Sequence, residues 1–314
     1  MEISWRRKDM KSDNHFRSTR KSQANLTVIL FLLPAFSLFL LFIVYPIVRS
    51  AYFSLFDWNG LGPAVNFVGL DNYKHILTDQ VFRKAVLNGL LIVLLSLTIQ
   101  LPFALALAIM VGRDLPGRTF FRMIFFLPYV LSEVITAIIW MGLLSPDPER
   151  GLVNAILILI PGVQAQTFLS DIHMVMASIF VVLTWKYFGL YTLLFTAGLQ
   201  NIPKEIEDAA RIDGANGWQV IRFITVPLLT GTIFTCVYLS VLGSLTQFNL
   251  VWIMTKGGPV NASEVMATYM YRYGFIRFWL GYGSSVALVM LAICLGFSII
   301  YLKFARQPDY LGNL

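Results

Sequence analysis

The stretch EIEDAARIDGANGW, residues 205–218, is a polar segment between two long apolar runs of a chain that is 57% hydrophobic. Asn201 is a suitable N-cap residue, Pro203 fits a first helical turn, and the acidic residues that follow favour the positive end of a helix dipole. Gly214 is a natural helix stop. The sequence therefore predicts a short helix that ends at Gly214, followed by a second helical stretch that continues through Pro227 into the next apolar run.

The overall composition indicates a membrane protein. Only 13% of the 314 residues are charged, whereas soluble domains carry about 25%. Cys236 and Cys294 both lie inside apolar runs without CxxC spacing, which argues against a disulfide framework or a metal site. The net charge of +7 does not indicate nucleic-acid binding, because the basic residues do not alternate with aromatic residues on a polar face.

Six apolar stretches are long enough to cross a bilayer as helices, which takes roughly 20 residues each. The predicted fold is an all-α integral membrane protein with six transmembrane helices and a cytoplasmic helix between spans four and five. The spans are predicted at approximately 26–50, 87–111, 120–144, 174–199, 223–254 and 282–304.

The distribution of Lys and Arg predicts the orientation. An even number of spans places both termini on one side, and most basic residues lie in the N-terminal segment, the second and fourth loops and the C-terminus. We therefore expect residues 1–24 to be a basic, uncleaved cytoplasmic tail and 25–306 to be one membrane domain. The loop 201–222 and a short tail, 307–314, are also expected to be cytoplasmic.

Four motifs resemble one family of transporters. The segment IPKEIEDAARIDGANGWQVIRFITVPLL, residues 202–229, resembles the cytoplasmic EAA loop of permease subunits in binding-protein-dependent ABC importers. The class is the sugar importers related to the larger permease of the maltose system. The segments FVGLDNYKHIL, WKYFGLY and TKGGPVNASEVMATYMYRYGF are similar to the same family. The resemblance covers about residues 26–305.

This resemblance implies that the loop helix docks in a cleft of a cytoplasmic ATPase subunit and transmits its movements. Asp208 occupies the acidic position of the motif, where the family usually has Glu, and Glu207 lies beside it, so either carboxylate can meet a basic partner residue. No GxxxxGK[ST] motif occurs, so ATP and Mg²⁺ are expected on the partner ATPase subunits and no cofactor or metal on this chain. The predicted coupling residues are Glu207, Asp208, Ala209, Ala210, Asp213, Gly214 and Ala215.

Two ionisable residues lie near the middle of predicted spans, where charges are costly and therefore informative. Glu133 lies in span three and Lys186 in span four. One interpretation is a structural pair that neutralises itself, and the other is a role in substrate binding. By resemblance, Lys186 and Tyr187 fall on the sugar-facing part of span four, and Tyr191 is either a sugar contact or a packing residue.

Span five carries a polar face. Ser240, Ser244 and Gln247 recur at i, i+4 and i+7, which stacks three hydrogen-bonding groups on one side of a helix, whereas Asn249 lies off that face. Such a face either bonds to neighbouring helices or lines the substrate path. The resemblance favours the path, since these positions match those where the maltose-type permease holds its sugar.

The sequence thus predicts a permease subunit of a bacterial or archaeal inner-membrane importer, which is not an enzyme. Its expected partners are a second, non-identical permease, a cytoplasmic ATPase dimer and an extracytoplasmic solute-binding protein. The expected substrate is a sugar or oligosaccharide, and a uronate oligosaccharide of the alginate type is one option because of Lys186. The alternative is an ion- or proton-coupled secondary carrier in which Glu133 and Lys186 form a relay.

Overall fold

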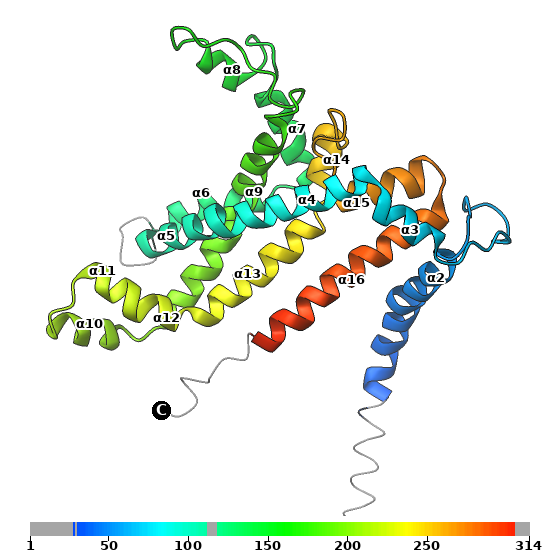
Figure 1. The fold of residues 1–314 in the computed structure, drawn as a ribbon. Helices are drawn as coiled ribbons and strands as arrows, with labels where there is room; N and C mark the ends of the chain where they lie inside the picture. The colour runs from blue at the N-terminus through cyan, green and yellow to red at the C-terminus, as the bar shows by residue number, and fades with distance from the viewer. Residues whose placement is uncertain (1–27, 29, 112–117, 305–314) are drawn as a thin grey trace, which may run out of the picture.

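The computed structural model describes residue 28 and residues 30–111 and 118–304 (Figure 1). The predicted tails 1–24 and 307–314 lie outside the described residues. Within the described part the chain is helical, and its β-structure is a single isolated bridge between Phe56 and Phe67.

The prediction of six spans is confirmed. Five helices are long and apolar enough to cross a membrane, and a sixth span is formed by two shorter helices joined at a sharp bend. The five long spans are Leu30–Phe53, Gln80–Val111, Val175–Gln200, Thr230–Thr255 and Leu280–Phe304, and the bent pair is Met123–Val130 with Glu133–Leu143.

Several spans are built from consecutive helical segments. The first span ends in a π-helical turn, η1 (Leu40–Val44), and α2 (Tyr45–Phe53). The second comprises α4 (Gln80–Leu95), η2 (Ser96–Gln100) and α5 (Leu101–Val111), and is preceded by α3 (Asp71–Thr78). The bent span comprises α6 (Arg118–Val130) and α7 (Glu133–Leu143), and the fourth span is α9 (Val175–Gln200).

The segment between the fourth and fifth spans contains α10 (Lys204–Ile212), α11 (Gly217–Val220), the π-helical turn η3 (Ile221–Thr225) and α12 (Val226–Leu228). The fifth span comprises α13 (Thr230–Leu245) and α14 (Asn249–Thr255), and the last is α16 (Leu280–Phe304). The connection before α16 holds α15 (Met266–Tyr271) and η4 (Arg272–Ile276), and α8 (Leu152–Leu157) lies between α7 and α9.

Figure 1 shows the arrangement of these elements. α8 projects at one end of the molecule, whereas α10, α11 and α12 lie together at the opposite end of the bundle. α2 meets the start of α16, and from there the first span diverges from the other helices. The side chains of that span are exposed along its length.

α9 is the central helix, packed against both α5 and α6. Gly189 permits the closest of these approaches, because a Cβ at this position would lie 1.9 Å from the Phe125 carbonyl oxygen. Small residues allow helix backbones in a membrane to approach closely, where van der Waals contact drives association. α9 is therefore fixed against the bent span, and the residues next to Gly189 in α9 reach the interior of the helix bundle.

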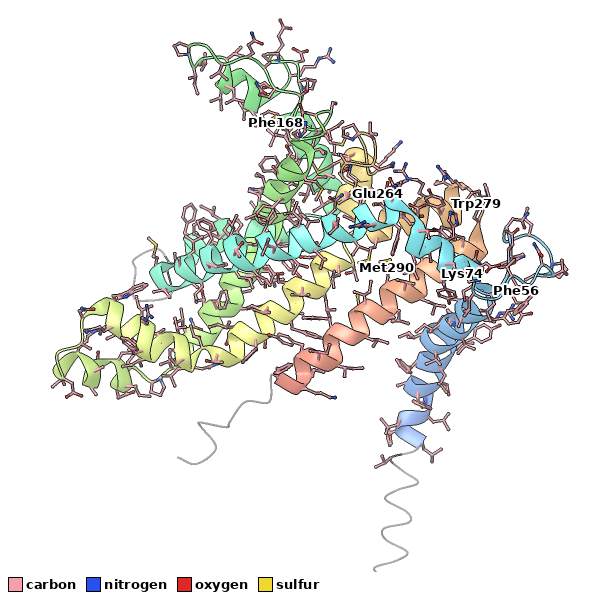
Figure 2. All side chains as sticks on the ribbon, in the orientation of Figure 1. Phe56, Lys74, Phe168, Glu264, Trp279 and Met290 are labelled. Atoms are coloured by element: carbon pink, nitrogen blue, oxygen red, sulfur yellow. The ribbon has the colours of Figure 1, made fainter. Side chains whose placement is uncertain are left out.

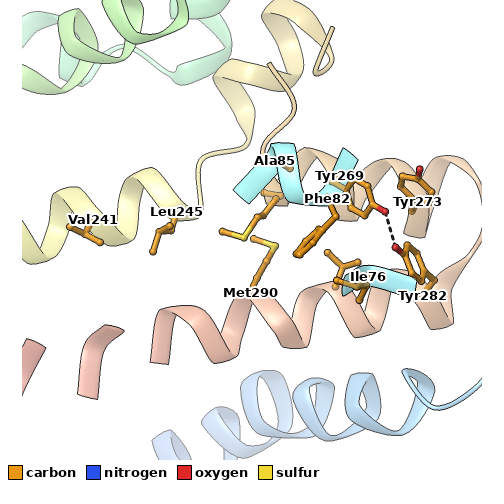
Figure 3. Packing of buried hydrophobic residues seen from close by; sticks show 12 residues of the cluster. Ile76, Phe82, Ala85, Val241, Leu245, Tyr269, Tyr273, Tyr282 and Met290 are labelled. Carbon is orange, nitrogen blue, oxygen red and sulfur yellow. Dashed lines mark hydrogen bonds between the residues drawn. The ribbon is translucent and has the colours of Figure 1, made fainter. Parts of the chain in front are cut away.

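A cluster of aromatic and aliphatic side chains joins α3, α4, α13, α15 and α16 (Figure 3). The Tyr269 hydroxyl lies 2.7 Å from the Tyr282 hydroxyl and donates to Asp79 at 2.9 Å. Asp79 is also the N-cap of α4, since its carboxylate accepts hydrogen bonds from the backbone of Val81 and Phe82. This cluster ties the start of the second span to the start of the last one.

The turn between α14 and α15 is built around a buried carboxylate, Glu264, which Figure 2 labels. Arg272 forms an ion pair with it at 2.8 Å, and Asn88 donates to its backbone carbonyl at 2.8 Å. Burial raises the pKa of the Glu264 carboxyl, while Arg272 acts in the opposite direction. The ion pair and the hydrogen bonds from Asn88 therefore hold this turn against α4.

Candidate functional site

Two of the predicted continuous spans are interrupted, and this is the main difference between the prediction and the structure. The span predicted at 120–144 bends by 104° between α6 and α7. The span predicted at 223–254 is broken between Leu245 and Asn249, where Thr246 and Phe248 leave the helical conformation. Inside a membrane the backbone groups released at such breaks need other partners, and such breaks are tolerated where they are enclosed by protein or line a cavity.

Lys186 supplies partners at the first break. Its side chain is 3% exposed, and its ammonium donates to the carbonyls of Pro128 at 3.2 Å, of Tyr129 at 3.0 Å and of Leu131. These carbonyls are at the C-terminal end of α6, where a cation is favoured by the helix dipole. Lys186 thus stabilises the end of the broken helix.

Both breaks border one cavity of about 470 Å³. Its walls come from the second, third, fourth and fifth spans. The polar lining residues are Gln100, Tyr129, Glu133, Tyr187, Tyr191, Ser240, Ser244, Thr246, Gln247 and Asn249.

The structure brings together six of the seven residues that the sequence predicts for the substrate path. Glu133, Tyr187, Tyr191, Ser240, Ser244 and Gln247 all line the cavity. Lys186 does not line it, and its ammonium is bound to the carbonyls of α6. Within the described residues no ion pair joins Lys186 to Glu133, so direct pairing, one of the two interpretations left open by the sequence, is not seen.

Glu133 is held by a neighbouring tyrosine. The Tyr187 hydroxyl donates a hydrogen bond to its carboxylate, and the carboxylate itself is only partly buried. Glu133 is the first residue of α7, and Ser132 before it caps the helix by accepting from the backbone of Ile135 at 3.2 Å. The bend thus places a carboxylate at the cavity wall with a fixed orientation.

Gln247 carries a polar group that the protein does not satisfy. Its side chain is 7% exposed, and its amide nitrogen Nε2 has no hydrogen-bond partner among the described residues. A buried donor without a partner costs about 1–3 kcal/mol. Because Gln247 lines the cavity, a ligand with hydroxyl groups is able to satisfy it.

Ser240 has a second role besides lining the cavity. Its hydroxyl lies 2.7 Å from the Ser96 hydroxyl, which donates to Gln100. Gln100 in turn donates to the Leu183 carbonyl at 3.3 Å. This chain of hydrogen bonds joins η2, α9 and α13, so at Ser240 the two interpretations of the polar face, interhelical bonding and lining, both apply.

The sequence analysis missed four polar lining residues, Gln100, Tyr129, Thr246 and Asn249. Asn249 was expected off the polar face, which holds for a continuous helix. The break at 246–248 changes the helical phase and brings Asn249 to the cavity. Pro128, adjacent to Tyr129, is the one sequence signal that marks a break in span three.

The helix predicted between the fourth and fifth spans is α10, and its ends differ in part from expectation. It begins after Pro203, and Asn201 is the C-cap of α9 rather than the N-cap of α10. The glycine stop is as predicted: Gly214 has φ +93, a conformation that disfavours other residues. Asn216 and Gln219 then start α11 with a capping box.

The two neighbouring acids of α10 have different surroundings. Glu207 is buried, and its carboxylate accepts a hydrogen bond from Thr225 at 3.0 Å, which joins α10 to η3. Asp208 is exposed and accepts from Arg211 at 3.0 Å. Glu207 therefore fixes the position of α10, and Asp208 is the acid that a partner can reach.

The surface beside α10 is accessible as well. Asp213, Gly214 and Ala215 line a small open cavity of about 340 Å³ together with side chains of α11 and η3. Ala209 is exposed and Ala210 is partly exposed. Ile212, Trp218 and Phe223 present large exposed apolar surfaces around the same tip of the molecule.

Comparison with known proteins decides the family. The protein-family model described as "Binding-protein-dependent transport system inner membrane component" matches residues 100–308. The chain belongs to this permease family. The matched region includes the broken spans, α10 and all of the polar residues that line the cavity.

Relatives of this permease extend the match over most of the chain. It is 36% identical over 288 residues to the probable ABC transporter permease protein YurN of Bacillus subtilis (strain 168), covering 91% of this chain and 98% of the relative. It is 31% identical to the diacetylchitobiose uptake system permease protein NgcF of Streptomyces coelicolor, covering 84% of this chain and 78% of the relative.

A solved structure shares the fold of this permease. A chain of a bacterial alginate ABC transporter, crystallised with an alginate pentasaccharide-bound periplasmic protein, superposes with a TM-score of 0.81 at 23% identity. The match covers 91% of this chain and 96% of that chain. The predicted class is confirmed: the chain is a multi-pass permease subunit of an ABC sugar importer, a translocation component rather than an enzyme.

Proposed function

We propose that the cavity between the broken spans is the sugar site of the import pathway. The observation that carries this proposal is the amide of Gln247, which is buried, lacks a hydrogen-bond partner among the described residues and lines the cavity. A sugar hydroxyl would accept from it. The volume of about 470 Å³ falls in the range of roughly 300–1,000 Å³ that ligand pockets occupy.

The chemistry of the lining supports a sugar ligand. Tyr129, Tyr187 and Tyr191 supply aromatic rings, and Ser244 and Asn249 add groups that both donate and accept hydrogen bonds. Sugars present apolar ring faces together with many hydroxyls, so a site for them combines aromatic faces with hydrogen-bonding side chains. The predicted path residues Glu133, Tyr187, Tyr191, Ser240, Ser244 and Gln247 would together form this site.

The importer would require partners. In this proposal the chain forms the pathway with a second, non-identical permease, and α10 docks on a cytoplasmic ATPase dimer that binds ATP and Mg²⁺. Asp208, Ala209, Ala210, Asp213, Gly214 and Ala215 would contact the ATPase, and Glu207 would position them. The orientation follows: α10 and both termini would be cytoplasmic, and α8 would face the extracytoplasmic solute-binding protein at the opposite end.

The substrate class is proposed as a sugar or oligosaccharide. A relative that is 31% identical is named for diacetylchitobiose uptake, which supports an oligosaccharide. The option of an acidic sugar depends on a cation in the path, and the geometry offers little support for it, since Lys186 is engaged with backbone carbonyls.

The test is isolation of the tagged chain from its native membranes, with mass spectrometry of the proteins that accompany it. We expect a second permease and an ATPase, and ATP-dependent uptake of a neutral disaccharide panel in proteoliposomes once the binding protein is added. Uptake that needs an ion gradient but no ATPase would refute the proposal and favour the secondary carrier.

A further inference from the structure

The cavity wall carries one charged side chain among the described residues, the carboxylate of Glu133. It accepts a hydrogen bond from Tyr187, and it takes part in no ion pair within the described residues. The carboxylate is partly exposed. A ligand in the cavity therefore meets the carboxylate directly, whereas the Lys186 ammonium, which interacts with Glu133 electrostatically, does not line the cavity.

Lys186 is the nearest candidate for a compensating charge, but its ammonium binds elsewhere. The Lys186 ammonium donates to three carbonyls at the end of α6, and Lys186 is not a lining residue. Those carbonyls hold the negative end of the helix dipole, so the ammonium offsets a charge of the backbone. The remaining lining groups are neutral amides, hydroxyls and aromatic rings.

We propose, on the basis of the function proposed above, that the cavity selects its sugar by charge and that Glu133 determines this specificity. Neutral and amine-bearing sugars are accepted, because a carboxylate forms strong hydrogen bonds with hydroxyl and ammonium donors. Sugars that carry a carboxylate are excluded, because a second negative charge in a partly dehydrated site is repelled. Gln247 on the opposite break supplies the complementary donor for a neutral hydroxyl.

The proposal can be tested without knowing the sugar, by measuring the charge preference of the cavity in the assembled importer. Gly243 lines the cavity, and a Cβ at this position would meet no atom within 4 Å. Gly243→Cys is introduced after Cys236→Ala and Cys294→Ala have removed the native thiols. The rates of modification by a cationic and an anionic methanethiosulfonate are then measured and divided by their rates with a free thiol in solution.

We expect the cationic reagent to react faster than the anionic one. Glu133→Gln should slow the cation and accelerate the anion by about tenfold each, since a unit charge acting over about 6 Å at an effective dielectric of about 40 has this effect. Glu133→Asp keeps the charge and should keep the preference. Glu149→Gln in an exposed outer turn is the matched control and should change neither rate.

The inference would be overturned by equal rates for the two reagents or by faster reaction of the anionic one. It would also be overturned if Glu133→Gln left the ratio of the cationic to the anionic rate unchanged. The ratio measured with Glu133 intact decides the matter even where Glu133→Gln fails to assemble. The outcome is separable from that of the proposed function: absence of uptake for every sugar counts against the importer, whereas the reagent rates alone decide the charge preference of the cavity.

Discussion

Replacing Lys186 by methionine separates a structural lysine from a substrate-binding one. Methionine keeps the length and the apolar stem but removes three donors to the carbonyls of Pro128, Tyr129 and Leu131. Leaving a buried carbonyl without its donor costs about 1–3 kcal/mol. We therefore expect fewer assembled complexes and an apparent melting temperature lower by several degrees in detergent.

Lys186→Gln is the matched variant, because an amide retains donors without the charge. It should recover part of the thermal stability. Uptake of a neutral sugar per assembled complex should fall in either variant, and the discrimination against its carboxylated analogue should stay as in the wild type. A Lys186→Met importer that melts like the wild type and takes up the neutral sugar normally, but loses measurable uptake of the carboxylated analogue, would refute this reasoning and restore the option of an anionic substrate.

Three further changes test other contacts. Gln247→Leu removes the unpartnered amide at similar volume, so uptake per assembled complex should fall about tenfold while the complex stays intact; unchanged uptake per complex would assign Gln247 to packing. Thr225→Val removes the hydrogen bond to Glu207 without changing the shape of the side chain, so less ATPase subunit should co-purify with the permease. Co-purification at the wild-type level would contradict the role of Glu207 in positioning α10. Gly189→Ala should prevent stable assembly because of the 1.9 Å contact, whereas Gly142→Ala, whose Cβ meets nothing within 4 Å, should not; equal stability of both would be inconsistent with the close packing of α6 and α9.

The sequence predicts those features of the fold that depend on local composition. Long apolar runs give the six spans, and the acid cluster with its glycine stop gives α10. The break at 246–248 escapes prediction, because these residues are neither glycine nor proline, and tertiary contacts override helix propensity there. The wrong placement of Asn249 has the same cause, because helical spacing assigns residues to faces only as far as the helix is unbroken, and Asn249 follows the break.

Lys186 shows a second limit of prediction. Its place inside a span identifies it correctly as a residue with a partner, yet the sequence offers Glu133 as the only opposite charge at similar depth. The structure provides carbonyls instead, which exist as free acceptors only because α6 ends inside the membrane. A partner that is created by a helix break leaves no mark in the residue pattern.

The positions of Glu207 and Gln247 connect the two candidate sites. Glu207 joins α10 to η3 through Thr225, and η3 continues through α12 into α13, which ends next to Gln247 at the cavity. A displacement of α10 by a docked partner would thus act on one end of a series of helical segments, interrupted at Leu229, whose other end borders the proposed sugar site. The break at 246–248 separates α13 from α14, and α14 is held by the Glu264 turn and by packing against α7. Movement at α10 would consequently change the cavity by shifting Ser244 and Gln247 against Glu133 and Tyr187, which belong to helices that the Lys186 contacts hold in place.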